Sequence, residues 1–168
     1  MDNQNLPQLL RQLSMARYLL LATVIATIVN MFLWVAQSEF VIPYCAILPY
    51  YLTILGYLFD GLTPGTYTVT GMILSLSLLS LWLLAWWKSK RRSAWLKVGL
   101  VLGILDTAIL CLYAFIITAT PSAFLMEMLL HGAVLYEIAT GIKAEKQLRQ
   151  FSGYEPTPTE MEYRDGIQ

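Results

Sequence analysis

The chain has 168 residues, of which 57% are hydrophobic and only 13% are charged. A soluble domain averages about 25% charged residues, so this composition excludes a water-soluble fold, which could not bury the apolar surplus. Eleven basic residues balance eleven acidic ones, which gives no support to nucleic-acid binding. The composition predicts one helical domain in a lipid bilayer, with no nucleic acid among its partners.

The first apolar run extends from Tyr18 to Ala36 and follows two basic residues, Arg11 and Arg17. This run is longer than the 7–15 residues typical of the apolar part of a secretory signal peptide, and no A-x-A cleavage site follows it. We therefore interpret residues 17–36 as a retained first membrane span.

The next apolar stretch, residues 40–59, is ambiguous. It contains Pro43 and Pro49 and is crowded with tyrosine and phenylalanine, a composition that suits the headgroup interface. Proline is nevertheless tolerated inside membrane helices when neighbouring groups satisfy the freed carbonyls, so a fifth span stays open. We expect a re-entrant or interfacial element here.

Three further runs, residues 68–87, 95–117 and 123–142, each have about twenty residues, the length that a hydrocarbon core of about 30 Å requires of a helix. The expected fold is thus an all-α membrane protein with four transmembrane helices and an added apolar segment, covering residues 1–151. Residues 152–168 are polar, acidic and proline-containing, which predicts a disordered cytoplasmic tail.

The basic residues favour four spans over five. All of them fall before the first span, between the second and third, or after the last: Arg11, Arg17, Lys88, Lys90, Arg91, Arg92, Lys97, Lys143, Lys146, Arg149 and Arg164. With four spans every basic residue faces the cytoplasm, as the positive-inside rule expects, and both termini lie there. With five spans, Arg11 and Arg17 would move to the outside.

Small residues recur at every fourth position of the 95–117 span, at Gly99, Gly103 and Thr107, and more weakly at Ala22 and Ala26 of the first span. Such stripes let two helix backbones approach closely. We expect them to pack helices within the monomer, with a dimer interface as the alternative.

Ionisable residues inside spans are the strongest functional signal, because an Asp near the bilayer centre costs about 2.5–3.5 kcal/mol on insertion scales. Asp106 lies at mid-span, and His131 lies at a similar depth on the next helix, sharing a face with Glu127. We favour a mutually satisfied polar clamp; a proton-relay or ligand site and, less so, a metal site are the alternatives. Asn30 is expected to join this network.

Familiar catalytic motifs do not occur. The sequence has no GxSxG, HExxH or CxxC pattern, and its single histidine excludes a bis-histidine haem. An enzyme is therefore disfavoured, and no cofactor or metal ligand is assigned.

Three stretches together resemble an uncharacterised family of small bacterial polytopic membrane proteins: residues 42–51, residues 103–107, and residues 129–136 continuing into 141–144. The resemblance covers about residues 15–150. It implies a bacterial cytoplasmic membrane and a family pattern that includes Asp106 and His131, and it carries over no activity.

The leading hypothesis is a non-enzymatic accessory or regulatory subunit that packs against a larger membrane protein or forms a homo-oligomer. Its basis is the small-residue stripes, the absence of internal repeats and the charged tail. The alternatives are a small transporter or binder of a lipophilic or cationic ligand that uses Asp106 and His131, and an intramembrane enzyme that uses the same residues.

Overall fold

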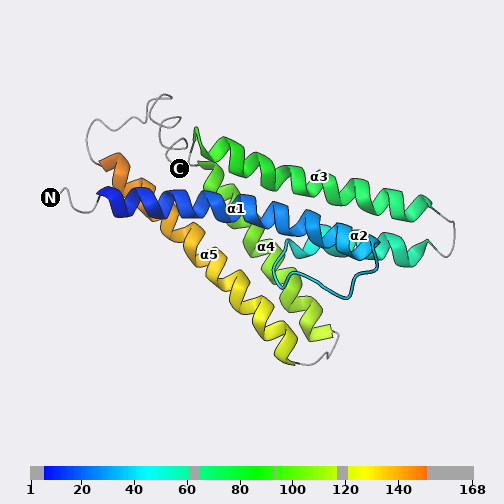
Figure 1. Cartoon of the computed structure of the whole chain (residues 1–168). Coiled ribbons are helices and arrows are strands. Elements are labelled where there is room, and N and C mark those ends of the chain that lie inside the picture. Colours follow the sequence, from blue (N-terminus) through cyan, green and yellow to red (C-terminus); the bar gives the residue numbers. More distant parts are fainter. Residues whose placement is uncertain (1–5, 61–64, 93, 117–120, 151–168) are drawn as a thin grey trace.

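The computed structural model describes residues 6–60, 65–92, 94–116 and 121–150. They form five helices and no strand: α1 (Leu6–Val35), α2 (Ile47–Phe59), α3 (Thr66–Ser89), α4 (Ala94–Ile116) and α5 (Pro121–Gln150) (Figure 1). By length and composition, α1, α3, α4 and α5 can each cross a membrane, whereas α2 is a shorter apolar helix. The prediction of an all-α fold with four spans is confirmed. The predicted tail, residues 152–168, lies outside the described residues.

The first and last helices, α1 and α5, are both longer than the predicted spans, because their apolar pattern continues beyond the membrane-length runs. Leu9 and Leu13 of α1 are buried, as are Ala144 and Leu148 of α5. Each pair is four residues apart and so shares a helix face. These four residues belong to the same apolar core, so the start of α1 packs with the end of α5.

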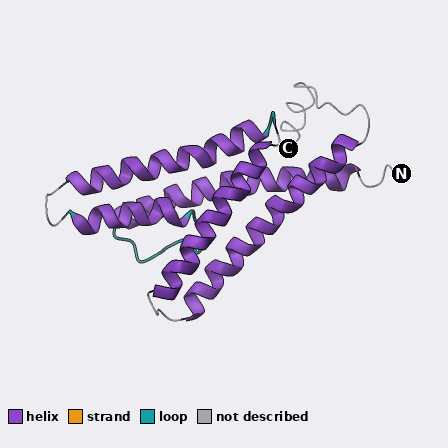
Figure 2. Cartoon of the chain, turned by 180° about the vertical axis from the view of Figure 1, so that it is seen from behind, coloured by secondary structure: helices purple, strands orange, loops and turns teal. Residues whose placement is uncertain are grey.

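Four helix ends gather at one end of the bundle, which we call the basic end. They are the start of α1, the end of α3, the start of α4 and the end of α5 (Figure 1). Arg17 of α1 donates a hydrogen bond of 2.9 Å to the carbonyl of Ser89 at the end of α3. Toward the opposite end, α4 and α5 diverge from the α2–α3 pair, and both views show this separation (Figures 1 and 2).

Residues 40–59, which we call the re-entrant segment, do not cross the bundle. After α1 the chain turns back along it, so that the backbone of Ile42 meets Asn30 and that of Ala46 meets Thr27. Helix α2 then runs toward the end that α1 had reached, where the rings of Tyr57 and Trp34 lie 6.5 Å apart. With 13 residues, α2 is about 20 Å long, too short for a hydrocarbon core of about 30 Å.

Helices α2 and α3 approach so closely that their facing glycines leave no room for a side chain. A Cβ atom added at Gly56 would lie 2.5 Å from the Tyr67 carbonyl oxygen, and one at Gly71 would lie 2.6 Å from that of Leu52. Nearby, the Ser75 hydroxyl donates to the Pro49 carbonyl at 2.6 Å. The close contact and this hydrogen bond fix the re-entrant helix against α3.

Candidate functional site

Asp106 of α4 binds the first turn of α2. Its Oδ2 atom accepts a hydrogen bond of 2.8 Å from the backbone N–H of Ile47, and its Oδ1 atom accepts one of 2.9 Å from that of Leu48. The side chain is buried, with 4% of its surface exposed. A carboxylate is well suited to this position, because the unpaired N–H groups and the dipole give a helix N-terminus partial positive charge.

The other backbone N–H groups at the start of α2 are also accounted for. Ala46 donates to the Thr27 hydroxyl at 2.7 Å, and Tyr50 donates to the Ala46 carbonyl at 3.3 Å. Pro49 has no N–H to satisfy. A helix that begins deep in an apolar environment needs this complete set of partners, because no bulk water is present to replace them. Asp106 and Thr27 therefore make the buried start of α2 possible.

His131 of α5 lies against the same carboxylate. Its Nδ1 atom is 2.9 Å from the Glu127 carbonyl, which can only accept, so Nδ1 carries a proton. Its Nε2 atom is 3.4 Å from the Asp106 Oδ2 atom. A second ring proton would make this contact a buried ion pair without net charge, whereas without it two lone pairs would face each other. The contact is therefore a hydrogen bond, with one proton between the Nε2 and Oδ2 atoms.

Asn30 and Tyr44 hold the chain that leads into α2. The Asn30 amide donates to the Ile42 carbonyl at 2.9 Å and accepts from the Ile42 N–H at 2.8 Å, so it pairs with that backbone as another peptide group would. The Tyr44 hydroxyl lies 2.9 Å from that of Thr23, and the Tyr44 ring lies 5.0 Å from the ring of His131. Asn30 thus acts on the same segment as Asp106 without contacting it.

Glu127 is only half-buried, whereas Asp106, His131 and Asn30 are buried. No hydrogen bond joins its carboxyl group to another side chain or backbone group in the described part of the chain. It does lie near enough to interact electrostatically with His131, Tyr50 and Tyr51. Tyr51 also contacts α4, since its ring centroid lies 4.4 Å from that of Tyr113.

Within the described ranges, His, Cys, Asp and Glu side chains form no group of three or more that could hold a metal ion.

Two glycines of the small-residue stripe are covered by side chains from other helices of the same chain. A Cβ atom added at Gly99 would lie 2.7 Å from Leu20 of α1, and one at Gly103 would lie 2.8 Å from Leu135 of α5. Thr107 is half-buried, and its hydroxyl donates to the Gly103 carbonyl at 2.8 Å. On α1, Ala22 is exposed and Ala26 is half-buried.

Sequence reasoning missed Thr23, Thr27 and Tyr44. Thr23, Thr27 and Asn30 follow one another at spacings of four and three, and all three are buried. A polar stripe at helical spacing on an otherwise apolar helix was the signal that could have identified Thr23 and Thr27.

Comparisons with protein-family models, curated proteins and solved structures found no match. The family resemblance of the three short stretches therefore stays a prediction.

Proposed function

We propose that the chain is a non-enzymatic accessory or regulatory subunit of a larger membrane protein, in a bacterial cytoplasmic membrane with its basic end toward the cytoplasm. One observation carries the proposal: the buried polar side chains are already used to position the re-entrant segment. Asp106, Thr27 and Asn30 each bind backbone groups between residues 42 and 48. These backbone groups occupy the polar side-chain atoms, which are therefore not open to a reacting substrate.

The packing also supports one choice of surface for the partner. Gly99 and Gly103 are covered by leucines of this same chain, so the small-residue stripe does not offer a close backbone approach to another protein. The outward face of α4 instead presents large side chains, among them Val101, Leu105 and Leu112, each more than half exposed. We propose that the partner packs on this face of α4.

In-cell photo-crosslinking tests this proposal. A photoreactive phenylalanine analogue replaces Leu105 on α4 in one variant and Ile73 on α3 in the other; both positions are at least half exposed. We expect a discrete protein adduct from position 105 and none from position 73, and an adduct of twice the chain's mass would identify a second copy. Lipid adducts alone from both positions, together with a monodisperse monomer from native membranes, would contradict the proposal.

A second candidate function is the binding or transport of a lipophilic cation. Glu127 favours it, because this intramembrane carboxyl group has no hydrogen-bond partner among the described residues and interacts electrostatically with Tyr50 and Tyr51. A carboxylate and nearby aromatic rings are the groups that attract such a ligand. Asp106 and His131 would then position the tyrosine-bearing helix.

Calorimetric titration with tetraphenylphosphonium, a lipophilic cation, tests this candidate. Glu127→Gln should weaken binding at least about tenfold, while Glu137→Gln, at another half-buried acid of α5, should leave it unchanged. No measurable binding by the native chain, or equal losses in both variants, would rule this candidate out.

A further inference from the structure

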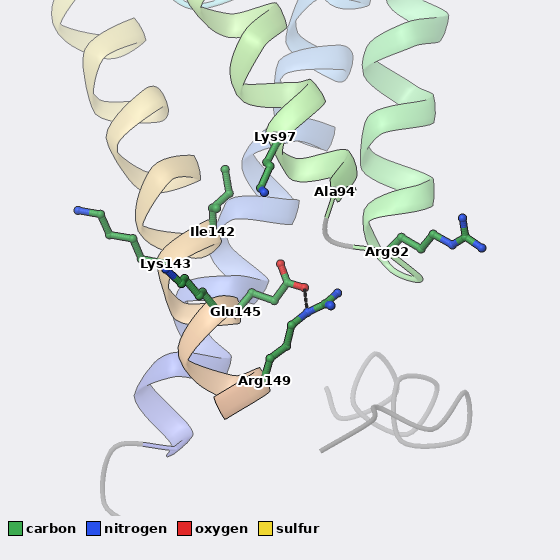
Figure 3. Close-up of a pocket in the computed structure, with 8 residues that line it drawn as sticks. Arg92, Ala94, Lys97, Ile142, Lys143, Glu145 and Arg149 are labelled. Carbon is green, nitrogen blue, oxygen red and sulfur yellow. Dashed lines mark hydrogen bonds and ion pairs between the residues drawn. The ribbon is translucent and has the colours of Figure 1, made fainter. Parts of the chain in front are cut away.

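A hollow lies between α4 and α5 at the basic end. It has a volume of about 700 Å³ and is lined by Arg92, Ala94, Lys97, Ile142, Lys143, Glu145, Lys146 and Arg149 (Figure 3). Small-molecule sites in proteins have volumes of about 300–1,000 Å³, so the hollow is large enough for a headgroup-sized ligand.

The charge of the lining is strongly one-sided. Five of its side chains are cationic and one, Glu145, is acidic. Glu145 is already paired with Arg149, whose Nε atom lies 3.1 Å from the Glu145 Oε1 atom. Figure 3 shows Lys97 extending from α4 beside Ile142, and Glu145 and Arg149 meeting near the end of α5, while Arg92 and Lys143 extend outward on opposite sides. The lining therefore has more cationic than acidic side chains, five against one.

The backbone adds to this field. Ala94, the first residue of α4, lines the hollow, so the positive end of the helix dipole lies there. The first turn of α4 contains no acidic residue that would neutralise it. Apolar walls from Ala94 and Ile142 are combined with this charge. A ligand that suits the whole lining is therefore anionic at one part and apolar at another.

From this combination we infer that the hollow binds a phosphate-bearing anion, and that its occupant is the headgroup of an anionic phospholipid. Basic pockets between membrane helices at the cytoplasmic side are suited to such headgroups, since the acyl chains can stay in the bilayer. The inference concerns α4, α5 and the adjoining Arg92 at the basic end. It takes the cytoplasmic orientation of that end from the proposed function, but it does not depend on a partner protein.

Native mass spectrometry of the full chain in detergent tests the site. The protein is offered equal amounts of phosphatidylglycerol and phosphatidylcholine with identical acyl chains. One variant carries Lys97→Gln with Lys146→Gln, which removes two charges from the hollow. The control carries Lys88→Gln with Arg91→Gln, which removes two charges from the neighbouring turn that does not line it. Thermal unfolding confirms that both variants fold.

We expect the native chain and the control to retain phosphatidylglycerol in preference to phosphatidylcholine. The variant with Lys97→Gln and Lys146→Gln should retain at least about tenfold less phosphatidylglycerol, because each cationic side chain raises the affinity for an anionic headgroup about fivefold. If millimolar pyrophosphate displaces the lipid and is itself retained through Lys97 and Lys146, the anion site stands but its occupant is a soluble phosphate compound. Equal retention of both lipids by the native chain, or equal losses in both variants, would overturn the inference.

Discussion

Asp106 illustrates how a single buried carboxyl group can be structural in a membrane protein. Its two oxygens serve two backbone N–H groups of α2, and His131 lies against the same group. Burial of such a charge is costly unless hydrogen bonds and an opposite charge compensate it. The residue therefore contributes to stability through the helix that it holds, and its loss should be felt in the re-entrant segment first.

We predict that Asp106→Asn loosens the start of α2. An asparagine side chain has one acceptor oxygen where the carboxylate has two, so one of the two N–H groups is left without its acceptor. A buried donor left without a partner costs about 1–3 kcal/mol. Cys45, which is 3% exposed, is a built-in reporter of this loosening. In a Cys111→Ser background, the Cys45 thiol should react with maleimide many times faster in the Asp106→Asn variant.

Glu137→Gln is the matched control, because it also removes one half-buried carboxyl group of the bundle but leaves the N–H partners of α2 in place. It should leave the Cys45 labelling rate unchanged. Equal labelling rates in the Asp106→Asn variant and the parent protein would show that Asp106 does not hold α2.

At the scale of elements, the pairing of α2 with α3 depends on a backbone contact that only glycine permits. Gly56 and Gly71 face each other, and a Cβ atom at either position would lie 3.1 Å from the Cα atom of the other. The obstructing atoms include backbone carbonyl oxygens, which cannot move aside as a side chain can. The two helices would therefore have to separate to accept an added methyl group.

We predict that Gly71→Ala destabilises the protein by about 1–3 kcal/mol, the usual range for an overpacked contact. Gly132→Ala on α5 is its control, since a Cβ atom there meets nothing within 4 Å. Alanine at position 132 should leave stability unchanged or raise it by up to about 1 kcal/mol through helix propensity. Thermal unfolding in dodecyl maltoside, followed by tryptophan fluorescence, measures both changes. An unfolding temperature of Gly71→Ala equal to that of Gly132→Ala would argue against the contact.

Asp60, between α2 and α3, gives this pair a dependence on pH. The backbone N–H of Gly65 lowers the pKa of the Asp60 carboxyl group, and the Thr68 hydroxyl, which donates to it at 2.9 Å, acts in the same direction. Because the folded protein binds this proton less tightly than the unfolded chain, Asp60 stabilises the fold above the ordinary carboxyl pKa of about 4. That stabilisation is lost as the pH falls through the lowered pKa.

We therefore predict that Asp60→Asn lowers the unfolding temperature at pH 7. The difference in unfolding temperature between this variant and the native chain should narrow as the pH falls below about 4. Unfolding scans at several pH values measure this. A constant gap between Asp60→Asn and the native chain at all pH values would contradict the assignment.

Much of this arrangement could be predicted from the sequence, and the limit has a physical cause. Run lengths and the placement of basic residues were enough for the four long helices. Counting residues inward was enough to expect Asp106 near His131, and the two side chains lie 3.4 Å apart. The role of Asp106 at α2 could not be predicted, because its partners are backbone N–H groups, which every residue except proline has.

At the scale of the whole molecule, the basic residues described by the structure gather where the helix ends gather. Arg11, Arg17, Lys97 and Arg149 all lie toward the basic end, which contains the start of α1 and the end of α5 (Figure 1). A fold with four crossings brings both ends of the chain to the same side of a membrane. The positive-inside rule predicts that this side is the cytoplasm.

We predict that single cysteines at Gln8, Thr66 and Arg91, in a chain lacking Cys45 and Cys111, will label differently in intact cells. All three positions are exposed in the structure. A membrane-impermeant maleimide should label position 66 from outside and should reach positions 8 and 91 only after the cells are opened. Labelling of position 8 from outside in intact cells would contradict the proposed orientation.

The pairing of Asp106 with α2 also constrains the order of events during synthesis. The carboxylate that completes α2 is 59 residues later in the chain than Ile47, so α2 emerges from the ribosome long before its partner exists. Until α4 has inserted, two N–H groups of α2 lack their acceptor, and an apolar environment cannot supply one. We expect residues 40–59 to wait at the membrane surface, next to water, and to enter the bundle only after α4 has been made. The re-entrant helix would then be among the last parts of this protein to form, although it is among the first to be translated.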